Sequence, residues 1–127
     1  MNNEEWKQIK YFKPEEFDSK DAPGSNAQMS FAFLKKLDWI RYWMKRPIKI
    51  NSGYRTKKHN EEVGGVKNSP HMIGVAADIH VPDSSFRFWL VVWSLLCGIK
   101  RIGIGKTFIH IDIDKRDEKG QNIIWLY

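Results

Sequence analysis

The chain has 127 residues, 42% of them hydrophobic, with six tryptophans, seven phenylalanines and a formal net charge of +6. That length supports one hydrophobic core and leaves no room for two independent domains, so residues 1–127 are predicted to form a single domain. The one cysteine, Cys97, excludes an internal disulfide, and the positive charge indicates either an anionic partner (nucleic acid, a membrane surface or an anionic cell wall) or simply a soluble basic surface.

The start of the chain does not have the pattern of an export signal. Its first 17 residues, MNNEEWKQIKYFKPEEF, contain acids where a secretory signal has basic and then apolar residues. No stretch approaches 18 consecutive apolar residues, the length that indicates a transmembrane helix. We therefore expect a protein synthesised in the cytoplasm without a signal peptide or a transmembrane segment.

The first half of the chain predicts two helices and a strand. Residues 13–19 (KPEEFDS) are typical of a short helix with Pro14 in its first turn, and turn-forming residues follow at 21–26. Between residues 29 and 45 apolar side chains recur every three or four positions with basic residues between them, the pattern of an amphipathic helix. Residues 48–52 then predict a short strand that leads into a long loop with a helical turn at KKHNEE (57–62).

The second half predicts four strands and one long helix. The strands are expected at 75–81 (VAADIHV), 101–105 (RIGIG), 107–114 (TFIHIDID) and 122–127 (NIIWLY). Residues 84–97 (SSFRFWLVVWSLLC) are apolar nearly all round, so we expect a buried helix that serines cap and Gly98 closes. Most tryptophans are expected in the core. The predicted fold class is α+β, with a small, mainly antiparallel sheet and flanking helices.

Two histidines and an aspartate have the pattern of a metal site. His71 and Asp78 are separated by six residues, and Gly74 between them allows the chain to turn back. His110 shares a strand face with Asp112, because side chains alternate along a strand. Two imidazoles and one carboxylate are a set that zinc accepts in hydrolytic sites, with a fourth position open to water. Either imidazole alone could instead be a buried structural histidine.

Several segments together resemble a known family. SPHMIGVAAD (69–78) matches the pattern S-x-H-x-x-G-x-A-x-D of the zinc D-Ala-D-Ala carboxypeptidases, peptidase family M15. NSGYRTKKHNEEVGG (51–65) resembles the S-G-Y-R segment of that family, and RIGIGKTFIHIDID with IIWLY resembles its last strands. The opening YFKPEEFDSKDAPGS is similar to small single-domain members, some of them encoded by phages. The resemblance covers nearly the whole chain and implies a hedgehog/D-Ala-D-Ala peptidase-like fold.

The resemblance implies particular roles for site residues. It implies that His71, Asp78 and His110 bind Zn²⁺. A zinc ion with these three ligands keeps a net positive charge, which activates water and polarises a carbonyl. Arg55 matches the arginine that meets the substrate, and its fork of donors suits a carboxylate or an oxyanion. Ser69 matches a serine that either hydrogen-bonds near the site or caps a turn.

The general base departs from the better-known pattern. Many relatives have an acid three residues before the last histidine, where this chain has Thr107. We predict that Asp112 replaces it, because it lies two residues beyond His110 on the same strand face. The alternative is that Asp112 only orients a ligand. Asp114 is expected to be exposed to solvent.

The implied function is hydrolysis of amide bonds in peptidoglycan stem peptides or cross-links, by a monomeric phage or prophage endolysin that acts on the cell wall after release or delivery. The sequence does not specify which bond is cleaved. One alternative is a zinc-binding module without activity, as the similar hedgehog domain illustrates. A basic nucleic-acid-binding domain is a weaker alternative, because the chain has no recognition motif for nucleic acid, and we expect no such partner.

Overall fold

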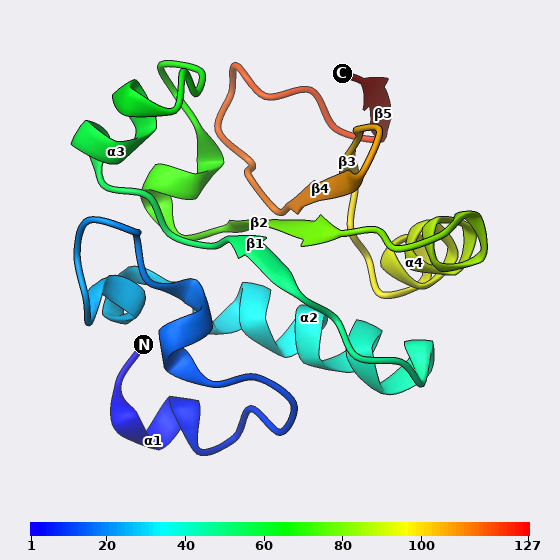
Figure 1. The fold of residues 1–127 in the computed structure, drawn as a ribbon, viewed down its shortest axis with the longest axis horizontal. Coiled ribbons are helices and arrows are strands. Elements are labelled where there is room, and N and C mark those ends of the chain that lie inside the picture. The colour runs from blue at the N-terminus through cyan, green and yellow to red at the C-terminus, as the bar shows by residue number, and fades with distance from the viewer.

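The computed structural model describes all residues 1–127 (Figure 1). Its strands are β1 (Ile50–Ser52), β2 (Ala76–His80), β3 (Arg101–Ile104), β4 (Phe108–Asp112) and β5 (Ile123–Leu126). Its helices are α1 (Asn3–Trp6), α2 (Phe31–Met44), α3 (Lys57–Glu62) and α4 (Ser84–Leu96). Three short 3-10 turns complete it: η1 (Pro14–Phe17), η2 (Ser25–Gln28) and η3 (Pro70–Ile73).

One five-stranded sheet organises the molecule, with the strand order β1-β2-β4-β3-β5. Three of its four pairings are antiparallel, and the edge strand β5 runs parallel to β3. All five strands lie where the sequence predicts them. Helices α2 and α4 pack against each other on one side of the strands, and the segment that contains α3 lies on the other side (Figure 1). The predicted α+β class with a mainly antiparallel sheet is confirmed.

The sheet has one apolar face and one polar face. Alternate residues of β2 and β4, including Ile79, Ile109 and Ile111, are fully buried in the core that the sheet forms with α2 and α4. The residues between them, including Asp78 and His110, therefore point to the opposite face. The alternation that builds the core thus also sets the polar side chains of two neighbouring strands beside each other.

Helix α2 forms as the sequence predicts, within two residues at each end. The Ser30 hydroxyl caps its start by accepting from the backbone N–H of Phe33. Phe33, Leu37 and Ile40 are fully buried, which places one stripe of the helix in the core. The helix ends where Lys45 adopts a left-handed conformation, two residues before Pro47.

Helix α4 departs from its prediction, because it is not buried. Only Phe86, Leu90 and Ser94 are inaccessible, since these three lie along the stripe that contacts the core. Val91 and Trp93 are partly buried against the core, whereas Phe88, Trp89, Leu95 and Leu96 are exposed to solvent. Its cap is also different: the Asp83 carboxylate, rather than a serine, accepts from the backbone N–H of Phe86 at 2.7 Å. Periodicity could not distinguish the two faces, because both are apolar.

One further prediction is wrong: of the six tryptophans only Trp6 is in the core, whereas the others are exposed or only half-buried. The helical turn predicted within the segment 53–71 is helix α3, which the Thr56 hydroxyl caps, and the segment ends in the turn η3. None of the helices has the length and apolar character that crossing a bilayer requires.

Candidate metal centre and active site

His71 lies in η3, and its neighbours fix the position of that turn. The Ser69 hydroxyl accepts from the backbone N–H of His71 at 3.2 Å, which is the capping alternative predicted for this serine. Gly74 ends the turn with a φ of 73°. A Cβ at Gly74 would lie 2.9 Å from the backbone carbonyl carbon of Gln28, so glycine is needed for both the conformation and the close approach.

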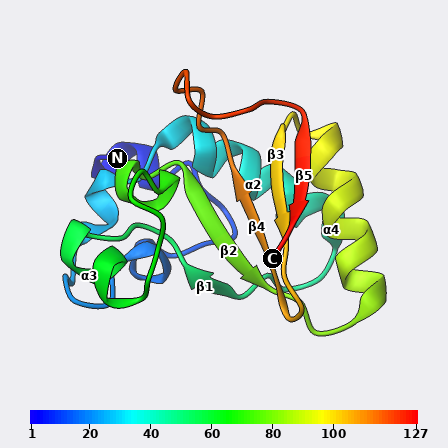
Figure 2. The same ribbon diagram turned by 90° about the horizontal axis from the view of Figure 1, so that it is seen from above.

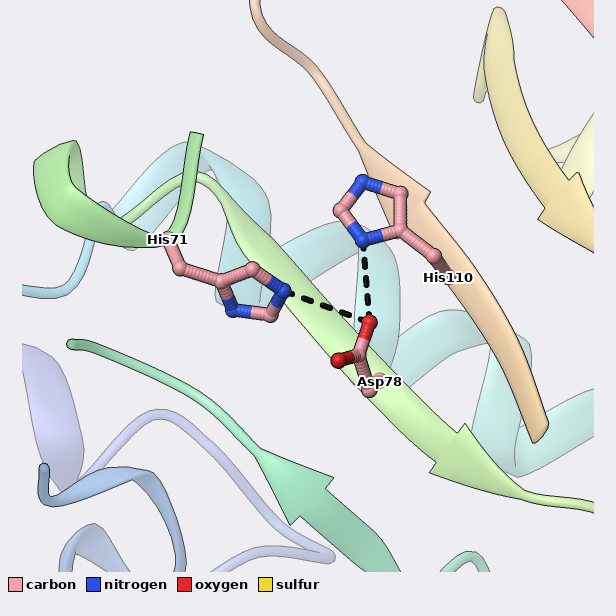
Figure 3. Close-up of side chains that lie close together, drawn as sticks. All are labelled: His71, Asp78 and His110. Carbon is pink, nitrogen blue, oxygen red and sulfur yellow. Dashed lines mark hydrogen bonds and ion pairs between the residues drawn. The ribbon is translucent and has the colours of Figure 1, made fainter. Parts of the chain in front are cut away.

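Asp78 and His110 are brought together by strand register. In the antiparallel pair of β2 and β4, Asp78 lies directly opposite His110. Both side chains point away from the core, and η3 brings the ring of His71 over the same face of the sheet (Figure 3). Residues that are up to 39 positions apart therefore meet at one point, and the predicted ligand set is assembled by the fold.

The three side chains meet around a single oxygen atom. Nε2 of His71 lies 3.2 Å from Oδ1 of Asp78, and Nδ1 of His110 lies 2.9 Å from the same oxygen (Figure 3). One ligand atom from each residue lies within 4.8 Å of the other two. Both histidines are buried, whereas Asp78 is half-buried and reaches the pocket. The site is thus a compact His-Asp-His cluster with one accessible side.

The other nitrogen of each ring lies against an oxygen atom that accepts a hydrogen bond. Nδ1 of His71 lies 2.6 Å from the carbonyl oxygen of Gly53, and Nε2 of His110 lies 2.6 Å from Oδ2 of Asp112. A carbonyl or an ionised carboxylate can only accept, so these ring nitrogens carry the hydrogens. In the neutral form of each ring, the lone pair is then on Nε2 of His71 or on Nδ1 of His110, directed at Asp78.

This arrangement fits a metal ion. Three electron-pair donors that face each other repel unless a positive charge lies between them. Ligands of tetrahedral zinc, at ordinary bond lengths, are roughly 3.3 Å apart. The separations of Asp78 Oδ1 from the two imidazole nitrogens, 3.2 and 2.9 Å, are close to that value. Three protein ligands are also the number found in catalytic zinc sites, which keep a position for water or substrate.

The electrostatics of the cluster favour a cation as well. Burial lowers the pKa of His71, which favours the neutral ring, the form that can act as a metal ligand. Burial alone would raise the pKa of Asp78, but the contacts with His110 and His71 outweigh it and hold that pKa well below its ordinary value. For His110 the carboxylates of Asp112 and Asp78 outweigh burial and raise the pKa. The ring of His110 thus lies in a negative environment that stabilises positive charge.

Arg55 lies against the cluster and holds the second oxygen of Asp78. Its Nη2 donates to Oδ2 of Asp78 at 3.1 Å, while Nε donates to Ser52 and Nη1 to the buried Asn60. This leaves Oδ1 of Asp78 to the two histidines. Three of the five guanidinium N–H groups are engaged, so two remain for a ligand. Arg55 also lines the pocket, as its predicted contact with substrate requires.

Asp112 does not face the pocket. The side chain is fully buried, Oδ2 contacts Nε2 of His110, and Oδ1 accepts from Nε of Arg101 at 2.8 Å and from the backbone N–H of Asp114. Asp112 therefore lies on the side of the His110 ring away from Asp78. This geometry favours the orienting role over the predicted role as general base. The prediction that Asp114 is exposed is wrong, because Asp114 is buried and paired with Arg116.

A cavity of about 470 Å³ opens onto the cluster. Its lining includes the cluster, Arg55 and two further cations, Arg101 and Lys119, against a single acid, Asp78. Such a cavity is large enough for a short peptide segment and attracts negative groups. Sequence reasoning gave neither of these cations a role, because Arg101 only opens the segment RIGIGKTFIHIDID, which is noted for His110, and Lys119 lies in no recognised motif.

Trp125 of β5 and Tyr127, which follows this strand, form a wall of the cavity. Trp125 lies 5.6 Å from His110 between ring centroids, and the guanidinium of Arg101 lies over the indole. Gly103 makes this possible, because a Cβ there would lie 2.6 Å from Nε1 of Trp125 and 2.7 Å from the ring of Tyr127. A glycine inside a strand often marks such a close approach, and this signal could have identified the wall.

Fold and site together define a class of protein: a small α+β domain whose sheet carries a His-Asp-His cluster that could hold a metal ion, in an open cationic pocket. A comparison with known protein families identifies one family within that class. The family model for Peptidase M15 matches residues 10–112, which include the whole cluster, so the chain belongs to the Peptidase M15 family. The family that the motifs resemble is therefore confirmed.

A curated relative matches part of the chain. Over 52 residues, the chain is 42% identical to the zinc D-Ala-D-Ala carboxypeptidase of Streptomyces albus G. The match covers 40% of this chain and 20% of the relative. The chain thus spans about a fifth of the length of that protein.

Proposed function

We propose that this chain is a zinc peptidase that hydrolyses amide bonds in peptidoglycan peptides, as a carboxypeptidase or an endopeptidase. The observation that carries the proposal is the cluster of His71, Asp78 and His110 in a pocket that Arg55 also lines. Family membership and the name of the curated relative support the choice of metal and reaction.

Different residues of the chain would have different roles in such a reaction. His71, Asp78 and His110 would hold the zinc, which supplies a Lewis acid for water and for the scissile carbonyl. Arg55 holds Oδ2 of Asp78 and presents its two remaining donors to a carboxylate or a developing oxyanion. Asp112 keeps the ring of His110 in the tautomer that leaves Nδ1 free to bind the metal.

The charge of the pocket supports an anionic peptide as substrate. Stem peptides of peptidoglycan carry free carboxylates, and the pocket presents Arg55, Arg101 and Lys119 around one acid. Arg101 is already paired with Asp112, whereas no hydrogen bond or ion pair engages the ammonium group of Lys119. We therefore propose that Lys119 binds a substrate carboxylate away from the bond that is cleaved.

Digestion of defined substrates tests the proposal. The zinc-loaded protein is incubated with purified peptidoglycan, with cross-linked muropeptides and with a soluble pentapeptide ending in D-Ala-D-Ala, and mass spectrometry identifies the products. Loss of a terminal alanine would assign a carboxypeptidase, and separation of cross-linked peptides an endopeptidase. A protein that binds zinc yet cleaves none of these substrates would disprove the proposed activity.

Arg55→Lys is expected to retain about one zinc per chain, because Arg55 is not a ligand, while kcat/KM falls by roughly tenfold or more. Lysine keeps the charge but cannot contact Asp78 and a substrate through one planar fork. The matched control is Arg46→Lys, since Arg46 forms a two-bond pair with Asp83 on another part of the surface. Equal kcat/KM for both variants and the wild type would remove Arg55 from the reaction.

A second candidate function is a zinc-binding module without turnover. The observation that favours it is that Asp78 is the only acid lining the pocket, while Thr107 occupies the position of the usual base and Asp112 is buried behind His110. Such a module would bind zinc and the muropeptide without cleaving it. Zinc analysis together with the product assay distinguishes the two functions.

We further propose that the enzyme acts as a lytic enzyme of a phage or prophage. Its small size and net charge of +6 suit diffusion to and retention on an anionic cell wall. Purified protein added to permeabilised bacteria should lower the turbidity of the suspension, and the His110→Ala variant should not. Cleavage of soluble peptide without any fall in turbidity would contradict a lytic role.

A further inference from the structure

Helices α2 and α4 lie next to each other (Figure 2). On the side of the sheet away from the metal centre they expose several large apolar side chains. We call this surface the aromatic face and define it by the following residues: Trp39, Tyr42 and Trp43 of α2, and Phe88, Trp89, Trp93, Leu95 and Leu96 of α4. Trp39 is 67% exposed, Phe88 59% and Leu96 71%. Side chains of this kind gather on one surface mainly where that surface binds something.

The aromatic face is continuous across the two helices. Trp93 stacks on Trp43 of the other helix with ring centroids 5.1 Å apart, and on Trp89 of its own helix at 6.4 Å. A shallow groove next to this row is lined by both Trp39 and Leu96. The exposed side of α4 carries no charged residue between Phe88 and Leu96, so the helix presents apolar side chains alone there.

Cations of α2 and of the residue after it lie beside this apolar surface, and neither helix has an exposed acid. Lys35 and Lys36 line the groove beside Trp39, and the ammonium group of Lys45 lies 3.9 Å from the ring centre of Tyr42. The one acid of α2, Asp38, is buried and accepts from the backbone N–H groups of residues 10 and 11. Helix α4 contains no acid. The surface is therefore apolar at its centre and positive along α2.

We propose that the aromatic face binds the surface of an anionic lipid bilayer. Tryptophan and tyrosine side chains favour the interface between headgroups and acyl chains, because each combines an apolar ring with a polar group. Exposed leucine and phenylalanine can insert more deeply, and lysines beside them are attracted to anionic headgroups. The aromatic face combines all three features.

Other occupants fit these observations less well. A second copy of the chain packed on the same face would bring two sets of lysines together, and the mutual repulsion would oppose association. A soluble polyanion would use the lysines and stack on the tryptophans, but it would gain nothing from Leu95 and Leu96. Charge complementarity together with exposed aliphatic side chains therefore favours lipid.

The position of the aromatic face leaves the metal centre accessible. The cluster lies on the polar face of the sheet, while the core between the sheet and α2 separates it from the helices (Figure 1). A molecule bound to a bilayer through α2 and α4 would thus hold its pocket away from the lipid. The inference does not depend on the proposed peptidase activity, because lipid binding requires no turnover.

Co-sedimentation with vesicles tests the inference. The full chain, loaded with zinc, is mixed with vesicles of phosphatidylglycerol and phosphatidylethanolamine and, separately, with vesicles of phosphatidylcholine alone. We expect sedimentation with the anionic vesicles, a shift of tryptophan emission to shorter wavelength, and weaker binding to phosphatidylcholine. Failure to sediment with anionic vesicles even at low salt would overturn the inference.

Variants of exposed residues locate the binding surface. The double variant Trp39→Gln, Leu96→Gln is expected to weaken partitioning into anionic vesicles by about tenfold or more, because it removes two side chains that insert. The control Val66→Gln changes an apolar residue that is 65% exposed at the pocket, on the other side of the sheet, and should bind like the wild type. Circular dichroism and zinc content verify that each variant folds.

Two results would assign the aromatic face to another occupant and reject lipid. One is a concentration-dependent dimer, seen by sedimentation equilibrium, that the double variant abolishes while neither protein binds vesicles. The other is vesicle binding that the double variant leaves unchanged but that Lys35→Gln, Lys45→Gln abolishes, which would indicate a purely electrostatic surface for any polyanion.

Discussion

Replacing His110 by alanine is expected to remove nearly all bound zinc and with it the proposed peptidase activity. The ring is one of only three proposed protein ligands, and two are too few to hold the ion against dilution. Loss of the Lewis acid should lower kcat/KM by roughly 10³-fold or more. His71→Ala should behave in the same way, because its Nε2 contacts the same oxygen of Asp78.

The matched control for these variants is His80→Ala. His80 lies on β2, on the same sheet face as Asp78, but opposite Phe108 and outside the cluster. It should therefore keep about one zinc per chain and full activity, as measured by metal analysis after exhaustive dialysis and by the product assay. Full zinc occupancy in both cluster variants would show that the metal is held elsewhere.

The elements of the fold could be predicted because their signals are local. Short apolar runs between turn residues mark the strands, with clear alternation in β4, and the spacing of Phe33, Leu37 and Ile40 marks α2. The same alternation places His110 on the polar face of its strand, so the cluster could be foreseen once the motif around His71 and Asp78 was recognised. These inferences need only the order of residues along single segments.

The rest could not be predicted because it depends on what packs against each segment. Helix α4 is apolar on both sides, and only its place at the margin of the core decides that Leu96 faces solvent while Leu90 is buried. Likewise, strand alternation puts Asp112 on the same face as His110, but the pairing of β3 with β4 brings Arg101 opposite and draws the carboxylate away from the pocket.

Asp112→Asn is expected to weaken zinc binding by about 10- to 100-fold while zinc-saturated kcat stays near that of the wild type. An amide cannot accept with both of its terminal atoms, so it cannot satisfy both the ring N–H of His110 and the guanidinium of Arg101. The imidazole would then lose the contact that fixes its tautomer. Competition with a chelator gives the zinc affinity, and product formation in excess zinc gives kcat.

The same variant decides between orienting and base catalysis. If Asp112 were the base, zinc affinity would be normal and saturated kcat would fall by roughly 10²-fold or more, since an amide cannot take a proton from water. Asp114→Asn is the matched control, because Asp114 is an equally buried acid two residues away that contacts Arg116 and neither histidine. A weakened zinc site in Asp112→Asn alone, with activity restored by excess zinc, would establish that Asp112 acts through His110.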